Sequence, residues 1–266
     1  MSVQFENTPL PDIVELKNIS QSYDGGKSFI IKDFNLLIED IPNRGQFVVI
    51  LGPSGCGKST ILRYIAGLQS PTSGEVYIKA KLRTDAERIG MVFQQYSSFP
   101  WLSVLDNVAL GLQFKGVSVK ERKERAMEMI KVVGLEGHEN KFAQYPSLSG
   151  GQLQRVAIAR SLLVNNEILL MDEPFGALDT NTRLRMQDFL INIGKQIEPT
   201  IILVTHDISE AVYLADDIFI MSNAPANFVE HISVNLPTNR DKEIKRDSNF
   251  IDLTRYIEDK MMKLEK

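Results

Sequence analysis

The chain has 266 residues and carries 30 lysines and arginines against 34 aspartates and glutamates, which gives a formal net charge of −4. This mildly acidic balance provides no global basic field, so nucleic acid is not expected as a partner. The longest apolar stretches, at residues 47–51, 168–171 and 201–204, are far shorter than the ~20 residues that a membrane-spanning helix needs. Residues 1–6 lack the pattern of a secretory signal, and the single cysteine, Cys56, excludes an intrachain disulfide and fits a reducing cytosol.

The N-terminal part is predicted to be β structure. Short β-like runs at residues 13–16, 29–38 and 47–51 are separated by turn sequences at 24–26 and 42–45, which is typical of antiparallel strands that lead into a buried strand. A glycine-rich turn follows, and the apolar residues of 59–68 then recur with helical spacing. The predicted order is therefore strand, loop and helix, and a further short strand begins at Glu75.

Helical patterns dominate between about residues 95 and 165, which predicts a helical subdomain inserted between strands. The clearest helix covers residues 118–133, where Ser118 and Glu121 have capping-box spacing and Gly134 stands at the position of a C-terminal cap. From residue 167 onward strands return as continuous apolar runs, which indicates a parallel sheet covered on both faces.

The predicted fold class is therefore α/β, with a parallel sheet, an N-terminal antiparallel β portion and the inserted helical subdomain. A single domain is expected over residues 1–239. Residues 240–266 are predicted to form a charged C-terminal tail that ends in an amphipathic helix, because charges dominate its first part and apolar residues recur at helical spacing in its second.

A phosphate-binding loop is predicted between the strand at 47–51 and the following helix. The sequence Gly52-Pro53-Ser54-Gly55-Cys56-Gly57-Lys58-Ser59 matches G-x-x-x-x-G-K-[ST] in the strand-loop-helix context that the motif requires. The glycines let consecutive backbone N–H groups point at phosphate oxygens, and the helix adds its positive N-terminal end. Lys58 is placed to reach the β and γ phosphates of a nucleotide, and the Ser59 hydroxyl to bind Mg²⁺.

Two carboxylates and a histidine follow later buried strands. The apolar run 168–171 ends in Asp172 and Glu173, at the strand edge where open α/β sheets bind ligands. Asp172 can hold Mg²⁺, directly or through water, and Glu173 can orient or deprotonate a water that attacks the γ-phosphate. His206 comes two residues after the run 201–204 and could bond to the γ-phosphate or the water; a structural histidine is the alternative.

A second anion-binding helix start is predicted at Leu148-Ser149-Gly150-Gly151-Gln152. The chain thus has two helix ends that favour phosphate and only one loop with a lysine. One way to use both is a head-to-tail pair of subunits, in which each nucleotide is closed by Ser149 and Gly151 of the other subunit. The alternative is that this serine only caps its helix.

These motifs, in this order, resemble the nucleotide-binding subunit of an ATP-binding-cassette (ABC) transporter over nearly the whole chain. The resemblance identifies the P-loop at Gly52 to Thr60, the Q-loop glutamine as Gln94, the signature sequence at Leu148 to Gln152 and the D-loop as Ala177-Leu178-Asp179. It also identifies Asp172 and Glu173 as the end of the Walker B strand and His206 as the switch histidine. It implies a P-loop NTPase core and an active ATPase.

The resemblance implies a role for each candidate site residue. Tyr23 is expected to stack on adenine, Glu173 to activate the attacking water with help from His206, and Ser149 and Gly151 to act from a second subunit. The cofactors are expected to be ATP and Mg²⁺, and their phosphates and metal to be held by Gly52, Pro53, Ser54, Gly55, Cys56, Gly57, Lys58, Ser59, Thr60, Gln94 and Asp172, of which Ser59, Gln94 and Asp172 are the metal ligands. Because Cys56 lies inside the loop, thiol alkylation is expected to block the ATPase, with bound ATP protecting it.

A finer resemblance concerns the transported substrate. The segment Ser98-Phe99-Pro100-Trp101-Leu102 is similar to the Pro-Trp segment of cassettes that serve nitrate, sulfonate, taurine and bicarbonate importers, and residues 221–237 resemble the C-terminal end of the same group. This implies an importer for a small oxyanion, although another substrate, export, or a soluble ABC ATPase without a transport role remain as alternatives. Trp101 is expected in an exposed loop against the membrane partner; a buried core position is the alternative.

The same resemblance implies the partners and the location. Expected partners are transmembrane permease subunits, a second copy of the chain or a homologous ATPase subunit in an ATP-sandwich dimer, and, indirectly, an extracytoplasmic substrate-binding protein. The expected location is the cytoplasmic face of the inner (plasma) membrane, as a peripheral subunit.

Overall fold

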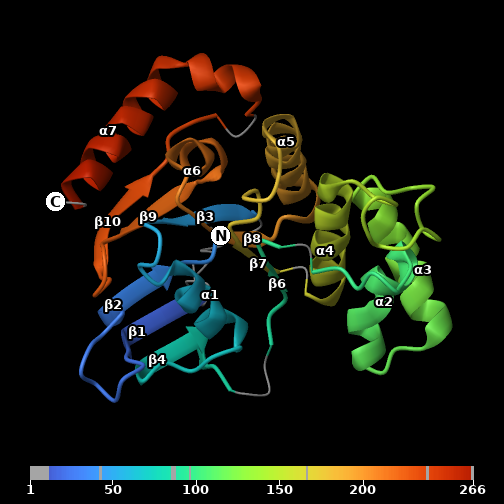
Figure 1. The fold of residues 1–266 in the computed structure, drawn as a ribbon, viewed down its shortest axis with the longest axis horizontal. Helices are drawn as coiled ribbons and strands as arrows, with labels where there is room; N and C mark the ends of the chain where they lie inside the picture. The colour runs from blue at the N-terminus through green and yellow to red at the C-terminus, as the bar shows by residue number, and fades with distance from the viewer. Residues whose placement is uncertain are drawn as a thin grey trace, which may run out of the picture.

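The computed structural model describes residues 12–41, 44–84, 88–95, 97–165, 167–237 and 240–264. The segment 1–6, which bears on a signal peptide, and residues 42 and 43 of a predicted turn lie outside the described residues. Two sheets and a set of helices make up the described chain, and a helical part extends to one side of the sheets (Figure 1).

The larger sheet contains the strands that end at the predicted site. Within the described residues it has six strands, in the order β10-β9-β3-β8-β7-β6. Its centre is formed by β3 (Gln46–Leu51), β8 (Thr200–Thr205) and β7 (Ile168–Asp172), which run parallel, and every residue of β3 and β8 is buried. The continuous apolar runs thus form strands covered on both faces, which confirms the parallel α/β sheet predicted from the sequence.

The edges of this sheet are shorter or antiparallel. On one side β6 (Met91–Val92) pairs with β7. On the other side β9 (Asp217–Met221) runs parallel to β3, and β10 (Phe228–Ser233) pairs antiparallel with β9. All the parallel strands therefore present their carboxyl ends at one edge, where the loop after β3 and the residues that follow β7 and β8 come together.

The second sheet is the antiparallel portion. It contains β1 (Val14–Gln21), β2 (Ile31–Ile38), β4 (Ser73–Ile78) and β5 (Lys81–Leu82), with β1 paired to both β2 and β4. Its buried side chains pack with one face of the larger sheet and with α1 (Lys58–Ala66), so the helix that begins at the P-loop is fixed between the two sheets. The helix is shorter than the predicted 59–68 because Gly67 takes a left-handed C-cap conformation, and Leu68 is exposed.

The helical part lies at the right of Figure 1 and comprises α2 (Val104–Phe114), α3 (Val119–Val132) and α4 (Gly150–Val164). Ser118 caps α3 by accepting the backbone N–H of Glu121, and Gly134 follows in the left-handed conformation, as the capping pattern predicts. The buried faces of α2, α3 and α4 belong to the same hydrophobic cluster as the other face of the larger sheet, so the helical part shares a core with the sheet.

The remaining helices cover the larger sheet on the side away from the antiparallel portion. These are α5 (Thr180–Ile197), α6 (Ile208–Leu214) and α7 (Ser248–Leu264), and the 3₁₀ turn η1 (Lys242–Arg246) precedes α7. In Figure 1, α7 runs over α6 and toward β10, and its side chains Phe250, Ile257 and Met261 are buried in the main cluster. Among the described helices, none has the length and apolar content needed to cross a bilayer.

Candidate functional site

The P-loop joins the end of β3 to the start of α1. Gly55 and Gly57 have φ values of 78° and 107°, in the left-handed region that side chains disfavour. A Cβ on Gly57 would also lie 2.9 Å from the Ile31 side chain, so both the turn and its contact with β2 require glycine here. The loop can therefore curl tightly enough to direct its backbone N–H groups inward.

Lys58 lies inside this curl. Its ammonium group donates hydrogen bonds to the carbonyl oxygens of Gly52 and Pro53, both at 2.8 Å, and only 4% of the residue is exposed. In the described chain, no side chain caps the start of α1 and its first turn has no acidic residue. A buried cation and a positive helix end thus face the same small volume, which is the environment that phosphate groups need.

Ser59 and Asp172 bring two oxygen groups together at the edge of the P-loop. The Ser59 hydroxyl, on the first turn of α1, donates to Oδ1 of Asp172, at the end of β7, over 2.7 Å. Burial raises the pKa of Asp172, and the hydrogen bond from Ser59 opposes that shift. Hydroxyl and carboxylate oxygens are the ligands that Mg²⁺ prefers, so this pair fits a magnesium site.

Glu173 and His206 form the next contact along the same edge. Oε1 of Glu173 and Nδ1 of His206 are 3.2 Å apart. The backbone of Glu173 has φ 42°, which is strained for a residue with a side chain, and its N–H donates to the carbonyl of Val204 on β8 over 3.0 Å. The strained backbone therefore turns the Glu173 side chain toward the residue that follows β8.

Gln94 approaches the same site from the edge strand β6. It follows Met91–Val92 by two residues, and its side-chain amide lies so close to Gly176 that a Cβ there would be 2.8 Å from Nε2. The Gly176 N–H in turn donates to the Glu173 carbonyl over 3.1 Å. Gln94 thus lies beside the turn that leads from Glu173 to the D-loop.

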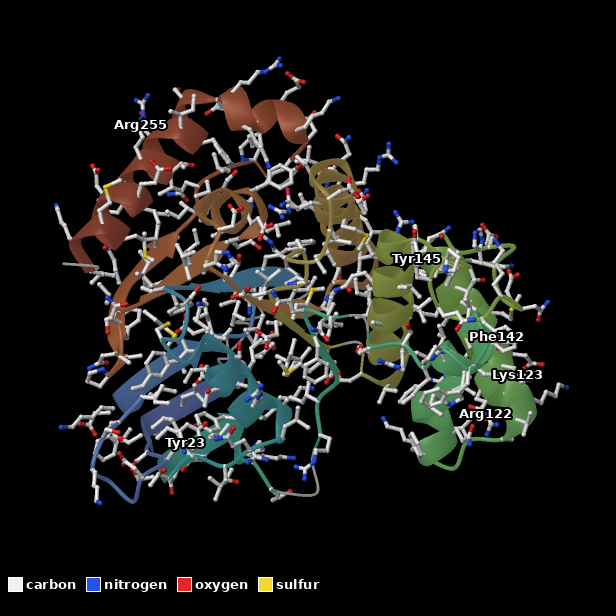
Figure 2. The ribbon with its side chains drawn as sticks, viewed as in Figure 1. Tyr23, Arg122, Lys123, Phe142, Tyr145 and Arg255 are labelled. Atoms are coloured by element: carbon white, nitrogen blue, oxygen red, sulfur yellow. The ribbon has the colours of Figure 1, made fainter. Side chains whose placement is uncertain are left out.

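The structure does not bring every predicted site residue to this edge. Tyr23 is 62% exposed, accepts a hydrogen bond from Gln69 and lies on the outer side of the antiparallel portion (Figure 2). Ser149 caps α4 in a full capping box with Gln152, as a helix cap would. Gly151 is buried against Thr182 of α5, and within the described chain no hydrogen bond or ion pair links Tyr23 or Ser149 to the P-loop.

The charged residues behind His206 are not recognisable as site residues from motifs in the sequence. A cavity of about 40 Å³ is lined by Glu173, Gly176, Arg183, Thr205, His206, Asp207 and Glu210. Glu210 is buried, with 6% exposed, and burial, followed by the charge of Asp207, raises its pKa to about 7. One signal in the sequence could have identified Glu210, because it is the one carboxylate in the largely apolar α6 segment. A buried acid beside a site is a candidate for a functional role.

Two further expectations concern accessibility. Trp101 is 68% exposed and packs against the ring of Phe99 at 5.4 Å, so the loop is exposed as expected. Only 1% of Cys56 is exposed and burial raises the pKa of its thiol, so its alkylation is expected to be slow; that alkylation blocks the ATPase stays a prediction. A buried thiol that stays protonated reacts slowly.

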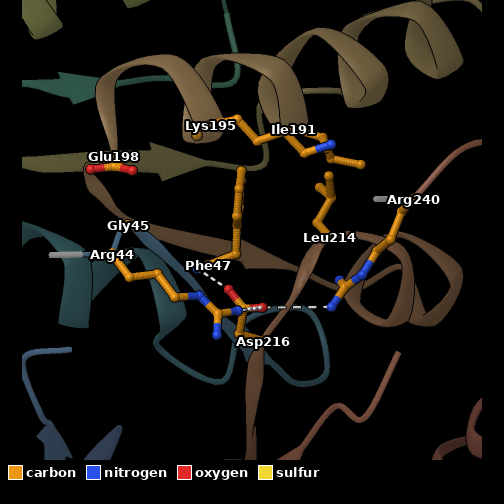
Figure 3. A pocket seen from close by; sticks show the side chains of 10 residues that line it. Arg44, Gly45, Phe47, Ile191, Lys195, Glu198, Leu214, Asp216 and Arg240 are labelled. Carbon is orange, nitrogen blue, oxygen red and sulfur yellow. Dashed lines mark hydrogen bonds and ion pairs between the residues drawn. The ribbon is translucent and has the colours of Figure 1, made fainter. Parts of the chain in front are cut away.

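A larger cavity, of about 380 Å³, lies at the opposite end of β3 (Figure 3). Its centre is the Asp216 carboxylate, which accepts the backbone N–H of Phe47 at 2.9 Å and lies 3.2 Å from Arg44 and 3.6 Å from Arg240. These contacts join the start of β3 to the first residue described in the C-terminal segment. The cavity is separate from the P-loop edge, because β3 runs between them.

Comparison with known proteins agrees with this arrangement. Residues 40–176 match the family described as ABC transporter. The nitrate import ATP-binding protein of Synechocystis is 42% identical over 247 residues, covering 89% of this chain and 90% of that protein. The taurine import ATP-binding protein of Escherichia coli K12 is 40% identical over 252 residues, covering 92% and 95%.

Solved structures are similar over most of the chain. The dimeric structure of a bacterial ABC transporter cassette matches with a TM-score of 0.68 and 37% identity, covering 84% of this chain and all of that one. The same cassette in a post-hydrolysis state bound to ADP and Pi gives a TM-score of 0.69. A subunit of the ABC transporter complex cbiONQ of Clostridium perfringens gives 0.75 at 27% identity, covering 93% and 99%.

The fold and the P-loop edge define a P-loop ATPase, in which a parallel sheet presents a lysine loop, two carboxylates and a histidine at one edge. Within that class, the chain belongs to the ABC transporter family and is one of its ATP-binding, ATP-hydrolysing proteins.

Proposed function

We propose that this chain is the ATP-hydrolysing subunit of an ABC importer for a small oxyanion, such as nitrate, a sulfonate like taurine, or bicarbonate. The observation that supports the importer class is the identity of 42% and 40% to the nitrate and taurine import ATP-binding proteins over 89% and 92% of the chain. The Pro-Trp loop at Phe99-Pro100-Trp101 supports the same group.

We propose that ATP binds along the P-loop. Lys58 exchanges its two loop carbonyls for phosphate oxygens, the backbone from Gly52 to Thr60 surrounds the phosphates, and Tyr23 stacks on the adenine. Ser59, Gln94 and Asp172 are the proposed Mg²⁺ ligands, and the Ser59–Asp172 contact of 2.7 Å supports this set. Mg²⁺ bound there neutralises the charge that develops on the phosphates.

We propose that Glu173 accepts a proton from the attacking water and that His206 orients the glutamate and the γ-phosphate. The observation that supports these roles is the 3.2 Å contact between the two side chains, at the strand edge that also holds Ser59 and Asp172. An exposed His206 can reach both the glutamate and a ligand in front of it.

We propose that two chains, or this chain and a homologous ATPase, form the complete site. Ser149 and Gly151 lie at the start of α4, away from the P-loop of the same chain. Ser149 is exposed and Gly151 lies buried behind it, so this helix start presents Ser149 to a nucleotide held by a second subunit. Domain limits of 1–239, with the helical subdomain at about 95–165, and a tail of 240–266 belong to the same proposal.

We propose that the exposed Trp101 loop contacts transmembrane permease subunits, which places the chain peripherally at the cytoplasmic face of the inner (plasma) membrane. The extracytoplasmic substrate-binding protein is then an indirect partner. The exposed aromatic pair of Phe99 and Trp101 supports a protein contact, because such residues are enriched at interfaces.

Affinity purification of the tagged chain from detergent-solubilised native membranes tests the transport assignment. A stoichiometric partner with several membrane spans is expected, and its loss in a Trp101→Ala chain supports the proposed contact. The purified assembly with its binding protein is then assayed for ATPase stimulation by nitrate, taurine and bicarbonate. Purification with soluble proteins alone overturns the transport function and leaves the ATPase in place.

A further inference from the structure

The backbone on both sides of His206 is held by one hydroxyl group. The Thr205 hydroxyl accepts the N–H of Asp207 at 3.0 Å and donates to Oε2 of Glu210, also at 3.0 Å. Asp207 in turn caps α6 by accepting the N–H of Glu210 at 3.0 Å. His206 therefore lies between Thr205 and Asp207, and the hydrogen bonds that join these two residues to each other and to Glu210 form a closed ring. The Glu210 carboxylate in this ring is buried.

Arg183 connects this ring to another helix. Its guanidinium lies 3.7 Å from Oε1 of Glu210 and 3.8 Å from Oδ2 of Asp207, so one cation on α5 contacts both carboxylates that fix the His206 loop. Two thirds of the Arg183 side chain is buried, and its Nε has no hydrogen-bond partner among the described residues. The contact is thus an ion pair in a sheltered place, where charges interact more strongly than on the surface.

The first turn of α5 also contacts the D-loop and the signature helix. Asp179 of the D-loop caps α5, accepting the N–H groups of Asn181 and Thr182 at 3.1 Å each. Thr182, the neighbour of Arg183, packs so tightly on Gly151 of α4 that a Cβ there would lie 2.9 Å from its methyl group. The turn of α5 that bears Arg183 is therefore in direct contact with both α4 and the D-loop.

We propose that Glu210 and Arg183 are positioning residues of the ATPase, which set the orientation of His206 and connect it to the first turn of α5. The proposal rests on the proposed role of His206. Glu210 fixes the Thr205 hydroxyl and thereby the backbone before and after His206. Because Arg183 on α5 forms an ion pair with Glu210, this arrangement depends on the position of α5. When a second subunit contacts the D-loop and the start of α4, a direct chain of contacts then connects that interface to His206.

A double-mutant cycle in the full-length chain tests this. Glu210→Gln keeps the shape of the side chain and removes its charge, and we expect it to lower kcat by about tenfold while KM for ATP changes by less than about twofold. In a His206→Ala background the same substitution should lower kcat by less than about twofold, because the residue that it positions is already gone. Arg183→Gln should behave in the same way.

Controls separate positioning from general damage. Glu230→Gln is the matched control, since Glu230 forms its ion pair with Lys260 on α7, away from the site, and should leave kcat unchanged. Thr205→Val removes the shared hydroxyl at nearly constant volume and should reproduce the loss of Glu210→Gln, so the test stands even if one variant does not fold. Glu210→Asp retains the carboxylate and should recover part of the lost kcat.

The outcomes are distinguishable. Equal loss of kcat from Glu210→Gln in the wild-type and His206→Ala backgrounds overturns the positioning role, as does an unchanged kcat in Glu210→Gln. Wild-type activity of the single variant His206→Ala contradicts the proposed function of the histidine itself. The kcat of this variant is therefore measured first, before the double variant.

Discussion

Glu173 is one of the residues whose backbone takes a left-handed conformation although they carry a side chain. Its left-handed φ of 42° places the carboxylate against His206, and the N–H bond to Val204 holds the turn in place. Such a strained conformation persists only where the surrounding contacts hold it in place. Here it directs the carboxylate toward the histidine, away from the direction that a regular extension of the strand would give.

Glu173→Gln preserves the size of the side chain and removes the proton acceptor, so we expect ATP to bind normally while kcat falls by about 100-fold or more. The ATP-bound protein should accumulate as a dimer in size-exclusion chromatography. Lys58→Ala is the contrast, because it should lose ATP affinity instead; turnover near the wild-type rate in Glu173→Gln would remove the glutamate from the mechanism.

Glu210 gives a prediction about pH and stability. Burial and the charge of Asp207 raise its pKa from 4.5 to about 7. The hydrogen bond from Thr205 and the charges of Arg183 and His206 act in the opposite direction. The charge of Glu210 in turn acts to raise the pKa of Lys245 in the C-terminal segment. The folded chain therefore holds a proton between pH 4.5 and about 7 that the unfolded chain has lost. Its contribution to the free energy of unfolding is complete below pH 4.5 and is lost as pH rises through about 7.

Glu210→Gln removes this titration. The variant should be more stable than the wild type at pH 8, by a few degrees in Tm, and the difference should shrink toward pH 5. Thermal unfolding at the two pH values measures it, with Glu230→Gln as the control. A variant that is less stable at pH 8 would contradict the raised pKa, whereas a more stable and less active protein separates positioning from folding.

At the level of residues, the sequence was sufficient to predict which residues meet at the P-loop edge when they lie in one stretch of chain or directly after a buried strand. Lys58 and Ser59 belong to a local motif, and Asp172 and Glu173 end a strand that is recognisable from its apolar run. Arg183 and Glu210 were not predicted, because their contact joins two helices and depends on how α5 packs beside α6. The exposure of the Cys56 thiol also depends on packing.

Among the elements, the P-loop shows how closely a turn depends on its neighbours. Gly57 combines a φ of 107° with a β2 side chain only 2.9 Å from where a Cβ would be. Gly57→Ala should therefore destabilise the fold by about 1–3 kcal/mol and weaken ATP binding. Gly116→Ala is the matched control, since its φ of 75° is also left-handed but nothing lies within 4 Å, and it follows α2, away from the P-loop; it should leave ATP affinity unchanged in equilibrium binding.

Element types followed from periodicity, and element ends from caps. The helix predicted at 118–133 is observed as Val119–Val132 because its Ser118 cap and Gly134 are local signals. The helix predicted at 59–68 ends earlier, at Ala66, because Gly67 adopts a left-handed conformation that its apolar neighbours do not reveal. The strands β9 and β10 were not predicted, although β9 has an apolar run at 218–221 as long as that of β7. Its pairing with β3, far away in the sequence, gives β9 its place in the sheet, and β10 pairs with β9 as its sequence neighbour.

On the scale of the whole molecule, the C-terminal helix is part of the main core. Ile257 is completely buried in the cluster that also contains residues of β3 and α6. Ile257→Ala should lower the free energy of unfolding by about 2–5 kcal/mol, measured by urea denaturation. Met262→Ala, on the exposed side of the same helix, should change it little. An effect of Ile257→Ala as small as the one expected for Met262→Ala would show that α7 does not contribute to the stability of the core.

The position of Lys58 has a consequence for the catalytic cycle. Its ammonium group is already out of water and held by two carbonyl oxygens inside the curl of the loop. Arriving phosphates therefore need not strip water from a mobile lysine or restrict its rotamers, and much of the entropic cost of ordering the side chain is met when the chain folds. Each turnover can then begin from a preorganised loop and return to it when the products leave.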